Sequence, residues 1–258
     1  MSDQRRILIT GANGVLGCVV ARHFLERDPD CRVFLGVREK RDDAEALASC
    51  HAGRAFLCPL EVTRADDWQE AVARIEAEAG PLSVLVNNAG CHDDALLAHM
   101  TGGQWARVLD ANLNAVFLGC QAALQPMLRE RWGRIINIAS AHALVASPFK
   151  AAYVAAKHGM LGLTKVTALE TAEEGITCNA ICPGYVWTPL VAGQIEDQAR
   201  AHGIPREDII RDVILAPQPT KRFIQVDEVA ALTVFLASDA GRSITGAAIP
   251  VEGGWTAR

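Results

Sequence analysis

The chain has 258 residues, half of them hydrophobic, and a formal net charge of −5 at pH 7. This acidic balance gives no electrostatic reason to expect binding to nucleic acid or to an anionic membrane surface. The sequence begins without a signal-peptide pattern, and no apolar run is long enough to span a bilayer, so we expect a cytoplasmic protein. Its eight cysteines are scattered, without a CxxC pair or a histidine cluster, which is typical of reduced thiols. We expect no metal site.

Short apolar runs alternate with segments of helical periodicity along the whole chain. Strands are expected at about 5–10, 31–39, 54–62, 81–90, 131–141, 174–184 and 246–255. Helices are expected at 19–28, 68–80, 104–131, 151–170 and 226–239. This order predicts an α/β fold, with residues 1–258 forming a single Rossmann-like domain around a doubly wound parallel seven-stranded sheet that has helices on both faces. The polar, proline-containing stretch 185–222 is too long for a simple connection and predicts a short helical lid over a substrate.

A glycine-rich turn separates the first expected strand from the first expected helix. Glycines let the backbone approach a pyrophosphate, and a helix N-terminus offers free N–H groups to it. The sequence therefore predicts a phosphate cradle, although a turn that merely connects strand and helix is the plainer alternative. The residues assigned to this cradle are Gly11, Asn13, Gly14, Val15, Leu16 and Gly17.

The ends of the next strands bear on the choice of cofactor. An acidic residue after the second strand would bind the adenosine ribose hydroxyls, whereas an arginine would meet the 2′-phosphate of NADP. This sequence has no acid at that place and has Arg38 just after it, which favours NADP(H), unless Arg38 is only a solvated side chain. We expect Glu61 and Val62 near the adenine, and Asn88, Ala89 and Gly90 along the cofactor crevice.

Tyr153 and Lys157 lie four residues apart on one expected helix and therefore share a face. The lysine ammonium, helped by a second cation such as a nicotinamide ring, could lower the tyrosine pKa from about 10 toward neutrality. Taken alone, such a pair more often marks a core aromatic beside a solvated lysine. Ser140 ends the fifth expected strand, and Asn112 is a polar residue within an apolar helical stretch, where it needs partners and would distort the helix.

These residues together resemble the short-chain dehydrogenase/reductase family along the whole chain. The glycines fall as TGxxGxxG, whereas compact members of that family usually have TGxxxGxG. The resemblance implies that Asn112, Ser140, Tyr153 and Lys157 are catalytic, with Tyr153 as the proton-transfer group and Ser140 stabilising the substrate oxygen. It also implies cofactor contacts from Tyr153, Lys157, Pro183, Gly184, Val186 and Thr188.

The second half of the chain is similar to bacterial (R)-3-hydroxybutyrate dehydrogenases in GRIINIASAHALVASPFKAAYVAAKHG, TKVTALETAEEGITCNAICPGYVWTPLV and GGWTAR. That resemblance implies oxidation of 3-hydroxybutyrate to acetoacetate with NAD, in a homotetramer. The alternatives are an NADPH-dependent reductase of another 3-oxo substrate, such as acetoacetyl-CoA, and a nucleotide-sensing binding protein. His92 and Tyr185 stand where that family usually has Gln and Trp. The implied substrate-binding residues for a small anionic substrate are His92, Ser140, His142, Lys150, Tyr153, Tyr185, Gln194 and Trp255.

Overall fold

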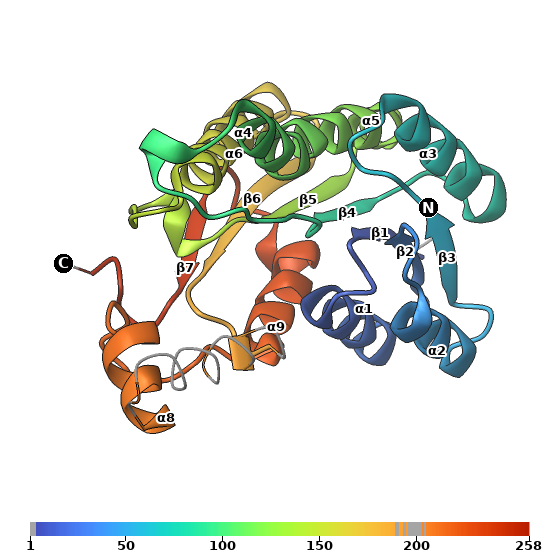
Figure 1. Ribbon diagram of the computed structural model, residues 1–258. Helices are drawn as coiled ribbons and strands as arrows, with labels where there is room; N and C mark the ends of the chain where they lie inside the picture. Colours follow the sequence, from blue (N-terminus) through green and yellow to red (C-terminus); the bar gives the residue numbers. More distant parts are fainter. Residues whose placement is uncertain (1–3, 189–190, 193–194, 196–202, 204, 258) are drawn as a thin grey trace.

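The computed structural model describes residues 4–188, 191–192, 195, 203 and 205–257. Seven parallel strands form one sheet in the order β3-β2-β1-β4-β5-β6-β7 (Figure 1). The order reverses direction between β1 and β4, as in a doubly wound sheet, and this places a crevice at the carboxyl ends of the central strands. The strands are β1 (Arg6–Thr10), β2 (Arg32–Val37), β3 (Ala55–Pro59), β4 (Val84–Asn87), β5 (Gly133–Ile138), β6 (Ile176–Pro183) and β7 (Ala248–Val251).

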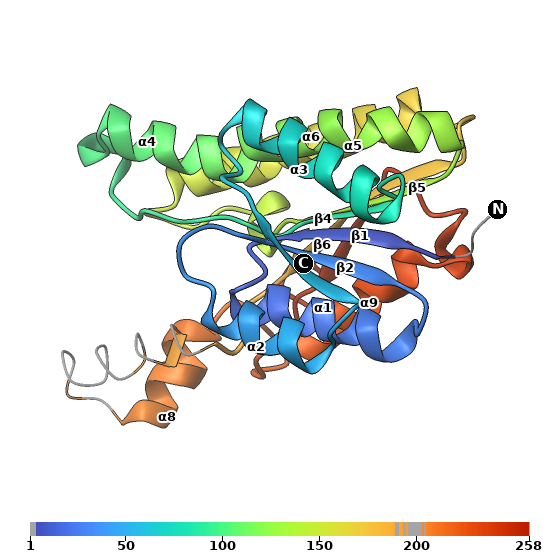
Figure 2. The same ribbon diagram turned by 90° about the vertical axis from the view of Figure 1, so that its right-hand side faces the viewer.

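Helices cover both faces of the sheet (Figure 2). One face carries α1 (Val15–Arg27), α2 (Asp42–Cys50) and α9 (Val226–Ala237). The other carries α3 (Ala65–Ala79), α4 (Gly102–Leu109), α5 (Ala115–Glu130) and α6 (Ala151–Glu170). Shorter elements are η1 (Leu97–His99), η2 (Asp110–Asn114), η3 (Ala141–Ala143), α8 (Arg206–Asp208), η4 (Ile209–Ile214) and η5 (Asp239–Gly241). None of the described helices is long and apolar enough to cross a membrane.

The central strands are buried on both sides, so their apolar side chains pack into two separate hydrophobic cores, one on each face of the sheet. Ile7 and Ile9 of β1 pack toward α1 and α9, with Phe24 among their neighbours. Leu8, between them, points to the opposite face and joins Trp68 of α3. This alternation follows from the two-residue period of a strand.

The structure confirms the predicted fold class and the seven strands. The helix expected at 151–170 is α6, with the same bounds. The helix expected at 104–131 is present as α4, η2 and α5, and the distortion expected at Asn112 is the π-helical turn η2. Helix α2, whose first turn holds three acidic residues, was not predicted from the sequence.

A buried hydrogen-bonded network joins the sheet to α6. Asn137 of β5 accepts a hydrogen bond from Asn87 Nδ2 of β4 at 2.9 Å and donates one to Thr164 Oγ1 at 2.9 Å. Asn137 is fully buried, so each of these polar groups depends on its partner for the hydrogen bonds that water would otherwise supply. The network therefore fixes the register of α6 against the two strands.

Replacing Asn137 with Ala should lower the free energy of unfolding by about 2–4 kcal/mol, since it removes two buried hydrogen bonds and opens a small cavity. Urea denaturation followed by circular dichroism measures this change. Asn114→Ala is the matched control: this exposed side chain donates to Asp110 Oδ1 at 2.7 Å, and its loss should change stability by less than about 0.5 kcal/mol. Equal effects of the two substitutions would show that the network is not stabilising.

Candidate active site

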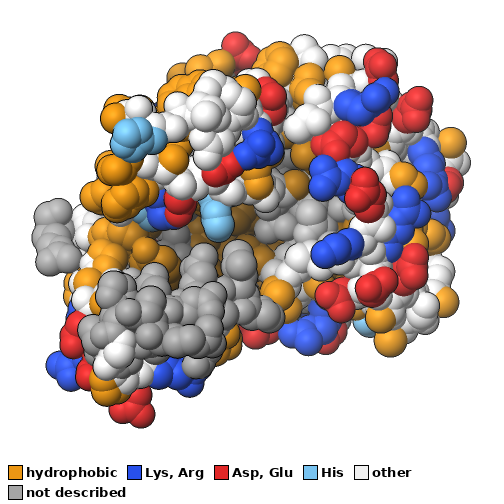
Figure 3. Space-filling model, in the orientation of Figure 1, with side chains coloured by type: hydrophobic (Ala, Val, Ile, Leu, Met, Phe, Trp, Pro, Cys, Tyr) orange, Lys and Arg blue, Asp and Glu red, His pale blue; other side chains and the backbone are white. Residues whose placement is uncertain are grey.

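The carboxyl ends of β1, β4, β5 and β6 meet at one edge of the sheet and surround a cavity of about 250 Å³. Figure 3 shows this face of the molecule hollowed at its centre, with a histidine and neighbouring acidic and basic side chains at the rim. The cavity gathers residues from the glycine turn, the strand ends, η2 and α6. Its lining is Leu16, Asn88, Gly90, Cys91, His92, Asn112, Ile138, Ala139, Ser140, Tyr153, Lys157, Pro183, Gly184 and Val186.

Two positions in the turn between β1 and α1 require glycine. Gly11 has a φ of +63°, and a side chain on Gly17 would lie 2.5 Å from the Gly11 carbonyl oxygen, so neither position accepts a larger residue without a shift. Asn88 Nδ2 donates to the Thr10 and Gly11 carbonyls at 2.9 and 3.2 Å, and Thr10 Oγ1 accepts from the Asn88 and Ala89 backbone N–H groups. The turn is thereby tied to the end of β4, with the N-terminus of α1 facing the cavity.

Some residues assigned to the cofactor have structural partners of their own. Asn13 Oδ1 accepts from the backbone N–H groups of Asp43 and Ala44 at 3.1 and 3.2 Å, which caps the start of α2. The Val62 carbonyl accepts from Trp68 Nε1 at 2.9 Å, and Thr188 Oγ1 accepts from the Val191 N–H at 3.3 Å. The lining of the cavity includes none of these three side chains.

Arg38 and Glu61 form an ion pair beside the ends of β2 and β3. Arg38 Nη1 lies 3.1 Å from Glu61 Oε2, and the arginine side chain is 69% exposed. The hydrogen bond and charge of Glu61 raise the pKa of Arg38. Burial opposes ionisation of Glu61, but hydrogen bonds from Arg38 and Thr63 outweigh it and lower the pKa of the carboxyl group. From the sequence, Arg38 was assigned to a 2′-phosphate and Glu61 to the adenine, and their ion pair was not predicted.

Ser140, Tyr153 and Lys157 come together at the floor of the cavity. A hydrogen bond joins the side chains of Ser140 and Tyr153. Lys157 is buried, its Nζ donates to the Ile138 carbonyl at 2.9 Å, and the same Nζ lies 5.5 Å from the centre of the Tyr153 ring. The strand end and the helix therefore place a hydroxyl, a phenol and an ammonium within one small volume.

Burial dominates the pKa values of this group in the protein chain without cofactor. Burial raises the pKa of Tyr153 to about 12, with the Ser140 hydrogen bond acting in the other direction. Burial also lowers the pKa of Lys157 to about 8. Both shifts favour the uncharged forms, because removal from water penalises each charge. In the protein chain alone, Lys157 does not bring the tyrosine pKa toward neutrality.

Asn112 is buried at the centre of η2. Its Nδ2 donates to the carbonyls of Cys91 and Val108 at 2.6 and 3.0 Å. Its Oδ1 is buried and has no hydrogen-bond partner among the described residues. A side chain at Gly90 would lie 2.5 Å from that oxygen, so the glycine keeps it open toward the cavity. π-Helical turns are frequent at functional sites, and this one aims an unsatisfied acceptor at the cavity.

An aromatic wall borders the cavity on the side of the C-terminal tail. Tyr185 stacks on Trp255 with ring centres 5.5 Å apart, and His142 packs edge-on against Trp255 at 5.1 Å and against Tyr153 at 6.0 Å. His142 Nε2 lies 2.9 Å from Ser147 Oγ. Burial and then the charge of Lys150 lower the pKa of His142 to about 4, so its imidazole is neutral at physiological pH.

The remaining residues assigned to the substrate lie at the rim or outside the described residues. His92 is exposed and lines the cavity. Lys150, just before α6, forms an ion pair with Asp94, which the sequence analysis did not single out. Two adjacent acids, Asp93 and Asp94, follow the NNAG turn, with Asp94 four residues beyond it. They could have indicated an acidic partner for a lysine near the site. Gln194 lies outside the described residues.

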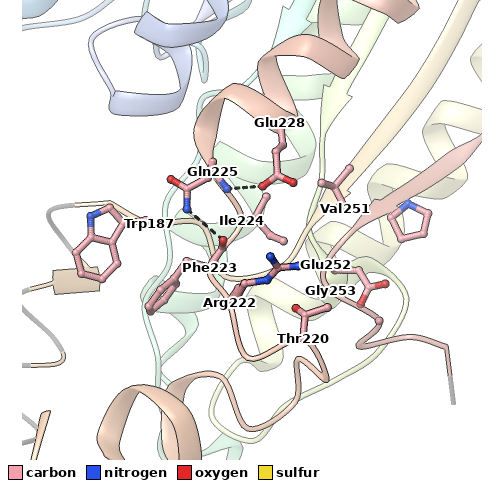
Figure 4. Close-up of a pocket in the computed structure, with 12 residues that line it drawn as sticks. Trp187, Thr220, Arg222, Phe223, Ile224, Gln225, Glu228, Val251, Glu252 and Gly253 are labelled. Carbon is pink, nitrogen blue, oxygen red and sulfur yellow. Dashed lines mark hydrogen bonds between the residues drawn. The ribbon is translucent and has the colours of Figure 1, made fainter. Parts of the chain in front are cut away.

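A larger cavity of about 900 Å³ lies elsewhere, between the segment 220–225, the start of α9 and the end of β7 (Figure 4). Gln225 and Glu228 line this cavity at the N-terminus of α9, where they form a capping box in which the Gln225 N–H donates to Glu228 Oε2 at 2.7 Å. Its lining includes neither Tyr153 nor Lys157. Size alone therefore does not identify the active site, and the clustered polar chemistry of the smaller cavity does.

Comparison with known proteins agrees with this geometry. The family model described as "Enoyl-(Acyl carrier protein) reductase" matches residues 11–256. A D-beta-hydroxybutyrate dehydrogenase of Rhizobium meliloti is 44% identical over 97% of this chain and 98% of its own, and one of Cupriavidus necator is 39% identical over 100% of both. A 3-oxoacyl-(acyl carrier protein) reductase of Staphylococcus epidermidis is 35% identical over 96% of this chain and 97% of its own.

A solved structure extends the likeness from sequence to fold. The crystal structure of an actinorhodin polyketide ketoreductase variant with NADPH matches with a TM-score of 0.90 and 32% identity, covering 100% of this chain and 99% of that one. The family model, the full-length relatives and the solved structure all indicate the same family. The chain belongs to the short-chain dehydrogenase/reductase family of oxidoreductases.

Proposed function

We propose that the protein interconverts (R)-3-hydroxybutyrate and acetoacetate with a nicotinamide dinucleotide. The observation that carries this proposal is that His142 packs against Tyr153, with ring centres 6.0 Å apart, while Lys150 lies three residues before Tyr153 at the start of α6. A small acid held there by its carboxylate would have its hydroxyl group near Tyr153. The two relatives named D-beta-hydroxybutyrate dehydrogenase, which match over nearly the whole chain, support the same substrate.

The chain's own residues fit a dinucleotide. The close-packed Gly11–Gly17 turn leaves the N-terminus of α1 open to a pyrophosphate. Lys157, fixed by the Ile138 carbonyl, still has donors for the hydroxyl groups of the nicotinamide ribose. When bound, the nicotinamide accepts the hydride, with its two electrons, from the substrate carbon.

The proton moves through Tyr153 and its neighbours. The substrate hydroxyl lies between Ser140 and Tyr153, and the phenolate oxygen of Tyr153 takes its proton as the C–H bond breaks and the ketone forms. Ser140 donates a hydrogen bond to the oxygen on which charge develops. The proton then leaves Tyr153 toward solvent through a water that the unsatisfied Oδ1 of Asn112 holds.

The substrate carboxylate lies at the rim. Lys150 supplies the charge, and neutral His142 supplies a hydrogen bond. His92 and Gln194 contribute further donors. Tyr185 and Trp255 form the apolar wall against the methyl end of the substrate. We propose that the whole chain forms one catalytic domain; the lid expected at 185–222 lies in part outside the described residues.

A second candidate activity is NADPH-dependent reduction of a different 3-oxo substrate, such as a thioester. The exposed Arg38 and the 35% identity to a 3-oxoacyl-(acyl carrier protein) reductase favour it. Lys150 and His142 favour the free acid, because a thioester has no carboxylate at that position. A nucleotide-sensing binding protein would not need Ser140, Tyr153 and Lys157 in this arrangement, and membership of an oxidoreductase family removes that alternative.

We also propose a homotetramer in the cytoplasm. The outer surfaces of α5 and α6 expose Phe117, Val166 and Leu169, which a neighbouring copy would cover. All eight cysteines are free, which fits a reducing compartment.

Turnover of acetoacetate is the test of the proposed activity. The purified protein should oxidise NADH or NADPH with acetoacetate more efficiently than with acetoacetyl-CoA, as measured by absorbance at 340 nm. Tyr153→Phe should lower kcat at least about a hundredfold, because it removes the proton-transfer group, while cofactor binding followed by fluorescence stays nearly unchanged. Preference for the thioester would support the second candidate activity instead, and no turnover of either would refute both.

Cofactor preference should depend on the Arg38–Glu61 pair. Glu61 neutralises the arginine that would attract a 2′-phosphate, so we expect wild-type protein to use both cofactors. Glu61→Gln should raise the NADPH-to-NADH ratio of kcat/KM by about fivefold, the equivalent of about 1 kcal/mol for a mostly exposed pair. Glu39→Gln, which removes a neighbouring acid outside the pair, should change the ratio less. An unchanged ratio in Glu61→Gln would mean that Arg38 does not approach the ribose.

The tyrosines of the free protein should remain protonated well above neutral pH. Burial raises the pKa of Tyr153 to about 12 and also raises that of Tyr185, so at each pH fewer phenolates form than in free tyrosine. The chain has two tyrosines, and tyrosinate absorbance at 295 nm reports both. Without cofactor, little absorbance should develop below pH 10. A transition near pH 7–8 that disappears in Tyr153→Phe would show that Lys157 alone lowers the tyrosine pKa.

A further inference from the structure

An ion pair joins Lys150, three residues before Tyr153, to Asp94, two residues after His92, and both Tyr153 and His92 line the cavity. Lys150 Nζ is 2.5 Å from Asp94 Oδ2, and the two side chains are 21% and 39% exposed. The lysine is the group assigned to the substrate carboxylate, and the acid comes from the loop between β4 and η1. The positive charge that should attract the substrate is therefore already neutralised within the protein.

The backbone brings the two residues together. Ala95 and Lys150 form a parallel β-bridge, and the Ala95 N–H donates to the Phe149 carbonyl at 2.9 Å. Phe149 has a φ of +70°, a left-handed conformation that is costly for a bulky side chain. On the other side, the Lys150 carbonyl accepts from the Val154 N–H at 2.8 Å, which starts α6. Asp94 therefore stays beside Lys150 even when the lysine side chain moves.

The charge of Asp94 also reaches the active site. Burial is the main cause that raises the pKa of Tyr153 and of Tyr185, and the charge of Asp94 raises both further. At His142, where burial and then Lys150 lower the pKa, the charge of Asp94 acts in the opposite direction. These three side chains surround the space assigned to the substrate. A carboxylate entering that space meets the negative charge of Asp94 as well as the positive charge of Lys150.

We propose that Asp94 is a specificity-determining residue, which competes with the substrate carboxylate for Lys150 and so limits the preference of this enzyme for small anionic substrates. The proposal rests on the proposed function, because it assumes that Lys150 binds the carboxylate. Substrate binding is then an exchange of one acid for another at the ammonium group. Uncharged 3-oxo compounds bind without this exchange. The ratio of kcat/KM for the acid to that for an uncharged compound is therefore smaller than it would be if Lys150 had no ion-pair partner.

Asp94→Asn tests this exchange, since it keeps the shape of the side chain and removes its charge. With the complete enzyme and saturating cofactor, kcat/KM for acetoacetate should rise about three- to tenfold, chiefly through a lower KM, as expected for loss of a partly exposed ion pair. The values for uncharged methyl acetoacetate should stay nearly unchanged. Asp93→Asn is the matched control: it removes an adjacent acid whose ion-pair partner is Arg107, and it should leave the acid-to-ester ratio unchanged.

A binding measurement separates this proposal from the proposed activity. In a Tyr153→Phe background without turnover, calorimetry should show acetoacetate binding more tightly to the enzyme–cofactor complex when Asp94 is also Asn. A lower kcat/KM for the acid in Asp94→Asn would overturn the proposal, because Asp94 would then be holding Lys150 in its productive position. Equal changes for acid and ester, or no tighter binding of acetoacetate, would overturn it as well. Absence of turnover in wild-type protein together with tighter binding in the variant would refute the proposed activity alone.

Discussion

The buried ammonium group of Lys157 is the interaction on which the active site depends. Burial of a lysine is costly, and the hydrogen bond to the Ile138 carbonyl partly compensates it. That bond joins the end of β5 to the first turns of α6, so it sets where Tyr153 lies relative to Ser140. The small buried residues Ala152 and Ala156 allow α6 to pack close enough to the sheet for the bond to form. Most of the described geometry follows from this one contact between a helix and a strand end.

The fold could be predicted from the sequence because its determinants are local. Buried parallel strands appear as short apolar runs, so all seven were found, several with bounds that are too wide, whereas α6 appears as an uninterrupted helical period and was found with its observed bounds. The distortion at Asn112 was expected but its form, a π-turn, was not, because that turn depends on a contact of Asn112 with Cys91, 21 residues away in the sequence. Sequence periodicity does not contain that information.

The active site could be predicted in its chemistry but not in its electrostatics. The resemblance to a known family identified Ser140, Tyr153 and Lys157, and the structure brings them into one cavity. In the chain without cofactor, burial raises the pKa of Tyr153 and lowers that of Lys157. The sequence could not predict these effects, because it shows which charges are neighbours but not how deeply each is buried. The ion pairs of Arg38 and Lys150 could not be predicted either, because their partners are distant in the sequence. Their partners, Glu61 and Asp94, are 23 and 56 residues away.

The two ends of the site are held by different kinds of contact. At the floor, Lys157 and Asn112 bond to backbone carbonyl groups, which cannot be lost by substitution of another side chain. At the rim, Arg38 and Lys150 are held by carboxylates that a single substitution would remove. Hydride and proton transfer need a fixed geometry, whereas recognition of a phosphate or a carboxylate needs only a balance of charge. The same catalytic floor can therefore serve different cofactors and substrates when the acids at the rim change, without any change in the chemistry below.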